Sequence, residues 1–155
     1  MIEIDLETIV NEIKTCIVDG INAELTTIDT EKADFVIPKL DVTNGIAIWR
    51  PNQAVLAYDP HIFVLPIKSK TIDGIHGGRN SEIQIYIEAQ TDPIAPERLD
   101  VKLCRYVLAL ERLFKKTEFS FDVSAQFDGV YDGADINSQF QDWAFAVMTL
   151  NTSIG

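Results

Sequence analysis

Residues 82–90, Glu82-Ile-Gln-Ile-Tyr-Ile-Glu-Ala-Gln90, decide the fold of this chain because apolar and polar side chains alternate along them without a break. The apolar positions are Ile83, Ile85, Ile87 and Ala89. A period of two is typical of a β-strand that buries one face and exposes the other. The chain therefore contains a strand whose apolar face needs a covering layer.

Two segments have the period of helices that can supply this layer. In the segment after Pro96, apolar residues recur every three or four positions: Leu99, Leu103, Tyr106, Val107, Leu110, Leu113 and Phe114. The same spacing occurs near the N-terminus, at Leu6, Ile9, Val10, Ile13, Ile17 and Ile21. Asp5 is the predicted N-cap of this first helix. Gly20 weakens its last turn, so the helix is expected to end near Ala23.

The remaining segments are read as strands and turns. We expect strands at 46–49, 54–58, 61–68, 119–128 and 143–150, and a short edge strand within 31–40. Asn44-Gly45 predicts a turn, and 54–58 and 61–68 are expected to form a hairpin across Asp59-Pro60. Residues 143–150 are apolar on both faces. Either both faces are buried within the domain, or one face meets another subunit.

These elements predict an α+β fold. An antiparallel or mixed β-sheet packs against two amphipathic helices, in the order α-β-β-β-α-β-β. The 155 residues suit one domain, residues 1–155. No apolar run reaches the length of about 18 residues that a membrane-spanning helix needs. The acidic N-terminus is unlike a secretory leader, so we expect an intracellular protein.

Charge is distributed unevenly along the chain. The formal net charge is −11, and no Lys, Arg or His occurs from Thr117 to Gly155. Between Arg98 and Lys116, in contrast, the second helix carries six of the thirteen basic residues. An acidic surface repels nucleic acid, which argues against a sequence-reading DNA-binding protein. The basic residues of this helix form either a solvated face or a surface for an acidic partner.

Residues capable of catalysis are few. Cys16 and Cys104 are expected to be free, buried thiols. His61 and His76 are the only candidate histidine bases, and the chain has no nucleophile elbow. The glycine-rich loop around His76 lacks the spacing of a phosphate or dinucleotide loop. Nor do the acidic residues of 128–135 have the spacing of an EF-hand loop. We therefore expect no catalytic residue, cofactor or metal.

In layout, the chain resembles the tail terminator (tail-completion) proteins of tailed bacteriophages. The resemblance covers nearly the whole chain, from the N-terminal helix through Ser-Glu-Ile-Gln-Ile-Tyr-Ile-Glu-Ala and the basic helix to the last strand, which ends Trp-Ala-Phe-Ala-Val-Met-Thr-Leu. It implies a structural virion protein, not an enzyme, that forms a ring, usually a hexamer. Such a ring caps the tail tube, stops its polymerisation and offers a surface to the head connector.

The resemblance also implies the partners and the location of the protein. The partners would be further copies of the chain, the tail-tube protein, the head connector or neck proteins, and DNA passing through the lumen without sequence-specific binding. The protein would lie in the neck region of the virion after assembly in the host cytoplasm. Our candidate ring or tube contacts are His76, Arg79, Lys102, Arg105, Asp128, Asp132, Asp135, Trp143 and Phe145. The first two lie in a loop (73–80), and the three aspartates lie in a turn (128–138).

Two other functions remain open at this point. A related neck or head-completion protein, or a tail-tube subunit, would also self-assemble but would stack on different partners. A small hydrolase or ligand-binding domain would use the loop around His76. That function requires a concave pocket that joins His76 to a carboxylate.

Overall fold

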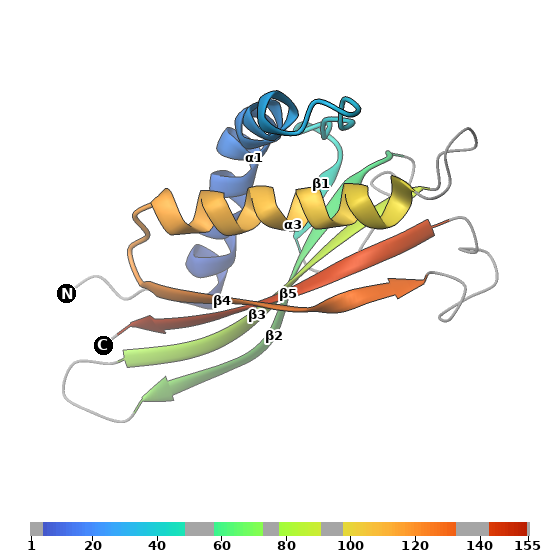
Figure 1. Cartoon of the computed structure of the whole chain (residues 1–155). Coiled ribbons are helices and arrows are strands. Elements are labelled where there is room, and N and C mark those ends of the chain that lie inside the picture. The colour runs from blue at the N-terminus through green and yellow to red at the C-terminus, as the bar shows by residue number, and fades with distance from the viewer. Residues whose placement is uncertain (1–4, 49–57, 73–77, 91–97, 133–142, 155) are drawn as a thin grey trace.

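The computed structural model describes residues 5–48, 58–72, 78–90, 98–132 and 143–154 (Figure 1). Their elements are α1 (Leu6–Glu31), β1 (Ile46–Ile48), β2 (His61–Ile72), β3 (Gly78–Gln90), α3 (Arg98–Lys116), β4 (Asp122–Asp132) and β5 (Trp143–Ile154). The predicted order of elements and the α+β class are confirmed. Within the described part of the chain, neither helix is both long and apolar enough to cross a membrane.

The strands form one five-stranded sheet in the order β1-β2-β3-β5-β4. β1 runs parallel to β2, and every other neighbouring pair is antiparallel. α1 and α3 lie on the same side of the sheet, so no helix of the described residues lies over the other face (Figure 1). The sheet is mixed and is covered on one face.

The core lies between the helices and the apolar face of the sheet. Ile83, Ile85 and Ile87 of β3 have no exposed surface, as the alternation of 82–90 predicts. Opposite them on β5 stand Leu150, Met148 and Ala146, which are also buried. The same face of β2 contributes Ile62 and Val64. Each of these side chains is removed from water, and this burial is the main force that holds the sheet to the helices.

The first helix is longer than its sequence predicts. Its N-cap is correct, since the Thr8 amide donates to Asp5 Oδ1 at 2.8 Å. It does not end near Ala23, however, but continues to Glu31. Gly20 allows α3 to approach closely, because a Cβ at this position would lie 2.4 Å from Leu113 Cδ1. The gain from this helix–helix contact outweighs the low helix propensity of glycine.

The short edge strand predicted within residues 31–40 is wrong. These residues finish α1 and then cross to the sheet without strand structure. Side chains satisfy their backbone groups instead. The Ile37 amide donates to Asp29 Oδ1 at 2.9 Å, and Asn22 makes two hydrogen bonds of 2.9 Å to the backbone of Leu40. Polar side chains of α1 therefore replace a neighbouring strand.

Two predictions concern the connection into the sheet, a turn at Asn44-Gly45 and a strand at 54–58. The Asn44-Gly45 turn is present, with the Gly45 amide donating to the Asp41 carbonyl at 2.6 Å. A Cβ at Gly45 would lie 2.8 Å from that oxygen, so glycine is needed there. Residues 54–57 of the strand predicted at 54–58 lie outside the described residues, and Tyr58 is not in a strand.

The Tyr106 hydroxyl ties this crossing segment to α3, which gives a test of the fold. Tyr106 is fully buried, and its hydroxyl donates to the Pro38 carbonyl at 2.8 Å. Tyr106→Phe leaves that carbonyl without its donor, so we expect the free energy of unfolding to fall by about 1–2 kcal/mol. Urea denaturation measures the change. Tyr131→Phe, at a side chain that is 47% exposed, is the matched control. Equal stabilities of the two variants would contradict this role of Tyr106.

Candidate functional site

The sheet face without helices is closed in part by aromatic side chains. The rings of Tyr86 and Tyr131 lie 6.0 and 5.4 Å from that of Phe145. Phe145 is 7% exposed and Phe63 is 5% exposed, although no helix covers them. Both faces of β5 are therefore buried within one subunit, which supports the first of the two alternatives for residues 143–150.

His61 is buried at the edge of this aromatic group. Its Nδ1 lies 2.6 Å from the Tyr58 carbonyl oxygen and its Nε2 lies 2.8 Å from Glu88 Oε2. The ring centroids of Phe63 and Trp143 lie 4.9 and 5.1 Å away. The carbonyl can only accept, so Nδ1 is the donor to Tyr58. With two hydrogen-bond partners and only 1% exposure of its imidazole, His61 contributes to the stability of the fold.

Both margins of the sheet carry unpaired strand edges. β4 is the last strand at one margin and, within the described residues, pairs with β5 alone. At the other margin, β1 pairs with Ile62–Val64 of β2, so the rest of β2 to Ile72 has no partner on that side within the described residues. Unpaired edges present free amide and carbonyl groups to another strand. They are the main candidates for association with another chain.

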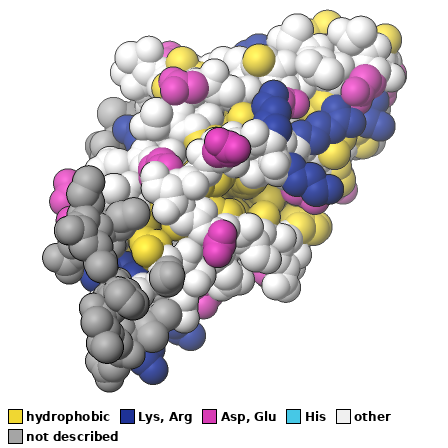
Figure 2. Space-filling model, turned by 90° about the vertical axis from the view of Figure 1, so that its left-hand side faces the viewer, with side chains coloured by type: hydrophobic (Ala, Val, Ile, Leu, Met, Phe, Trp, Pro, Cys, Tyr) yellow, Lys and Arg dark blue, Asp and Glu magenta, His cyan; other side chains and the backbone are white. Residues whose placement is uncertain are grey.

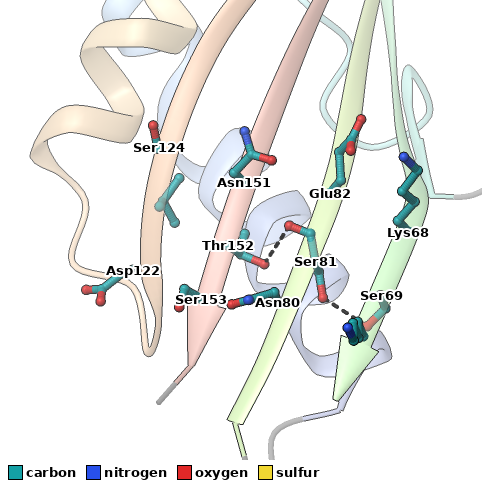
Figure 3. Close-up of a pocket in the computed structure, with 12 residues that line it drawn as sticks. Lys68, Ser69, Asn80, Ser81, Glu82, Asp122, Ser124, Asn151, Thr152 and Ser153 are labelled. Carbon is teal, nitrogen blue, oxygen red and sulfur yellow. Dashed lines mark hydrogen bonds between the residues drawn. The ribbon is translucent and has the colours of Figure 1, made fainter. Parts of the chain in front are cut away.

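A shallow groove of about 760 Å³ crosses the sheet from one of these margins to the other, at the level of their charged side chains. Its lining residues come from β2, β3, β5 and β4 in turn, and all of them except Val123 are of polar or charged types (Figure 3). Lys70 lies on one margin and Asp122 on the other, and Ser81 and Thr152 lie between them. The Thr152 hydroxyl donates to the Ser81 carbonyl at 3.4 Å. The groove is open, and the hydrogen bonds described for its serine hydroxyls join Ser69 to Ser81 and to Arg79, not to a base that could activate a nucleophile.

Apolar side chains reach the surface along β4. Phe127 and Val130 are 46% and 38% exposed, and Val101 of α3 is 40% exposed. Seen from the end at which α3 finishes and β4 begins, hydrophobic side chains are visible beside Lys and Arg side chains (Figure 2). A second, smaller groove between the two elements includes Lys115 and Val123. α3 therefore leaves the outer part of β4 uncovered.

The structure corrects the predicted basic face of α3. Lys102 and Arg105 are each 7% exposed, so they do not belong to a solvated face. Lys102 Nζ donates to the Gln90 carbonyl at 3.0 Å, and Arg105 NH2 donates to Asp34 Oδ1 at 2.6 Å. The Arg105 guanidinium also lies 4.3 Å from the centroid of the Phe35 ring. Since both cations are engaged inside the chain, their burial does not support their assignment as ring contacts.

The C-terminal half of α3 is also linked to α1. Arg112 NH1 lies 2.8 Å from Glu31 Oε2, and Lys116 Nζ contacts Glu24 Oε1. These two cations were candidates for contact with an acidic partner, but they form ion pairs within the chain. A partner surface on this helix is thus reduced to its remaining exposed positions, such as Lys115.

The other predicted contact residues have different locations. Arg79 lies within β3, not at a loop tip, and donates to Ser69 Oγ at 2.7 Å. Asp128 lies in a bulge of β4, not in a turn, and accepts from the Thr149 hydroxyl. Asp132 is the last residue of β4. His76 and Asp135 lie outside the described residues, so the pocket expected around His76 stays a prediction. Trp143 is half-buried beside His61.

The thiols and acids of the described residues offer little chemistry. Cys16 and Cys104 are both free, as predicted, but Cys16 is only half-buried and Cys104 is exposed, so the predicted burial of the two thiols is wrong. Burial raises the pKa of the Cys16 thiol, which makes it a poor nucleophile at neutral pH. Among the described residues no group of His, Cys, Asp and Glu side chains could hold a metal ion.

Comparison of the chain with models of known protein families and with curated protein sequences finds no match.

The His61–Glu88 pair predicts a clear effect of truncation. Glu88→Ala leaves the buried imidazole without its second partner, so we expect a loss of about 1–3 kcal/mol in the free energy of unfolding. Glu82→Ala, on the same face of β3 but without a hydrogen bond within the described residues, is the control and should change stability little. Chemical denaturation of both variants decides the point. A Glu88→Ala protein as stable as the control would show that the pair is dispensable.

The Asp34–Arg105 pair predicts an acid-sensitive contribution to stability. The hydrogen bond from Arg105 holds the pKa of Asp34 below its ordinary value of 3.8. A carboxyl whose pKa is depressed on folding stabilises the protein above the unfolded-state pKa, and this stabilisation is lost as the pH falls through the folded-state pKa. The stability difference between the wild type and Asp34→Asn should therefore shrink in acid. Asp19→Asn, at another exposed carboxyl, measures the general effect of removing one charge. A difference that stays constant down to acid pH would contradict the assignment.

Proposed function

We propose that the protein is a structural component of a bacteriophage tail that assembles into a ring and caps the end of the tail tube. The proposal joins the resemblance of the chain to tail terminator proteins with one feature of the fold. That feature is the pair of unpaired strand edges at opposite margins of one sheet. Different edges on identical subunits allow head-to-tail contacts, and such contacts close into a ring when the rotation between neighbours is suitable.

The contacts and surfaces of the described residues are more typical of a binding protein than of an enzyme. His61, the histidine that the structure describes, is buried in a pair with Glu88. The groove across the sheet is open and shallow, and no hydrogen bond within the described residues joins one of its serines to its lysines or carboxylates. The exposed apolar side chains gather on the strands at the margins. Such surfaces are typical of protein–protein contacts.

In the proposed mechanism, one side of the ring stacks on the last ring of the tube and the other side differs from it. No further tube subunit can then add, and the outer side is left for the head connector. The excess of acidic residues lets DNA pass through the ring, because like charges repel it from the wall.

Mass in solution tests this function. We expect a discrete closed ring of about six subunits by light scattering over a wide range of concentration. Electron microscopy should show annular particles with a central opening, and tail tubes that have bound the protein should stop growing. Open-ended growth would instead identify a tube subunit. A protein that stays monomeric, with tubes present as well as absent, would overturn the proposal.

A further inference from the structure

We infer that neighbouring copies of this chain join their sheets edge to edge, with the free part of β2 in one copy lying antiparallel to β4 of the next and Lys70 facing Asp122. The inference rests on the proposed function, since it identifies the contact that would build the ring. The partner of each free edge is a second copy of the same chain.

Charge complementarity is the first observation behind this pairing. β2 carries Lys68 and Lys70 and no acidic residue, whereas β4 carries Asp122, Asp128 and Asp132 and no basic residue. Lys70 and Asp122 are exposed and have no ion-pair partner within the described residues. Opposite charges on facing strands stabilise a sheet, and like charges destabilise it. Pairing of β4 with β4, or of β2 with β2, would place like charges together.

The register of the sheet is the second observation. Lys70 pairs with Asn80, Asn80 with Ser153, and Ser153 with Asp122. These four residues form one row across the sheet, so Lys70 and Asp122 mark its two ends at the same height. Figure 3 shows Asn80, Ser153 and Asp122 of this row. A ring whose axis follows the strands keeps that height from copy to copy, because rotation about the axis adds no rise. Lys70 of one copy then meets Asp122 of the next.

The alignment tolerates the stagger that a curved sheet needs. Closing a sheet on itself shifts neighbouring strands along each other. A shift of two residues in one direction places Lys68 opposite Asp122, and a shift of two in the other leaves Lys70 diagonal to it. Diagonal neighbours remain within reach of a long side chain. One lysine of β2 therefore faces Asp122 in each of these registers.

Strand direction also agrees with the pairing. β2, β3, β5 and β4 alternate in direction, so the two marginal strands run in opposite directions. When a second sheet continues the first with the same face outward, its β2 lies antiparallel to β4. Antiparallel strands form well-aligned hydrogen bonds. The helices of both copies then remain on one side.

Exposed apolar residues add little to this contact. Four large hydrophobic side chains on the two strands are exposed: Ile67 on β2, and Phe127, Val130 and Tyr131 on β4. Ile67 lies in the free part of β2, but the three residues of β4 stand at the level of His61–Val64, the part of β2 that β1 occupies. The pairing therefore rests on free backbone groups and complementary charge.

Charge reversal tests the pairing in the full-length protein. Lys70→Glu and Asp122→Lys each place like charges at the contact, so each should raise the concentration for half-assembly about tenfold. The double variant Lys70→Glu/Asp122→Lys restores opposite charges and should recover the ring. An equimolar mixture of the two single variants should also recover it, because alternating copies then present complementary edges. Light scattering gives the masses, and thermal unfolding checks that each variant is folded.

Lys32→Glu, an exposed reversal on the helix side, is the matched control and should leave the ring intact. Rings that survive both single reversals would overturn the pairing and leave the ring function standing. Single variants that fail to assemble, without rescue in the double variant or the mixture, would also overturn it and indicate that the charges act elsewhere. Rings that respond as expected but do not stop tube growth would contradict the proposed function and not the pairing.

Discussion

Burial of three isoleucines along β3 organises the rest of this structure. Ile83, Ile85 and Ile87 occupy the middle of the sheet and are fully enclosed beneath α1 and α3. Helices on one side alone leave the opposite face to be closed by the strands themselves, and the aromatic contacts around Phe145 do this. At the margins, β4 and the part of β2 beyond β1 have no further strand beside them within the described residues.

Periodicity predicts most of the fold because it records which side chains lose contact with water. The strand at 82–90 and the helix after Pro96 have an unbroken period and are both correct. Predictions failed where packing outweighed local preference. Gly20 marks a close approach of α3 instead of a helix end, and its position against Leu113 is a tertiary contact with no signal in a single sequence. The crossing segment at 31–40 has strand-like composition but is held by Asn22 and Asp29.

The candidate surface was harder to predict than the fold. Lys102 and Arg105 were assigned to an exposed face because charged side chains are usually solvated, yet each finds an acceptor inside the chain. Lys70 and Asp122 were not singled out, although the opposite charges of their strands are visible in the sequence. Their relation depends on three successive strand pairings, and no single segment contains that information. Charge patterns gain meaning only once the order of the strands is known.

The limited length of the free edges has a consequence for how the proposed ring would form. β1 occupies the first part of β2, and the irregularity after Phe127 bends β4, so each edge offers only a few residues in line. A single contact of that size is weak, but the subunit that closes a ring gains two contacts at once, and none can leave without breaking two. Assembly then becomes nearly all-or-none: single subunits coexist with complete rings, while partial arcs stay rare.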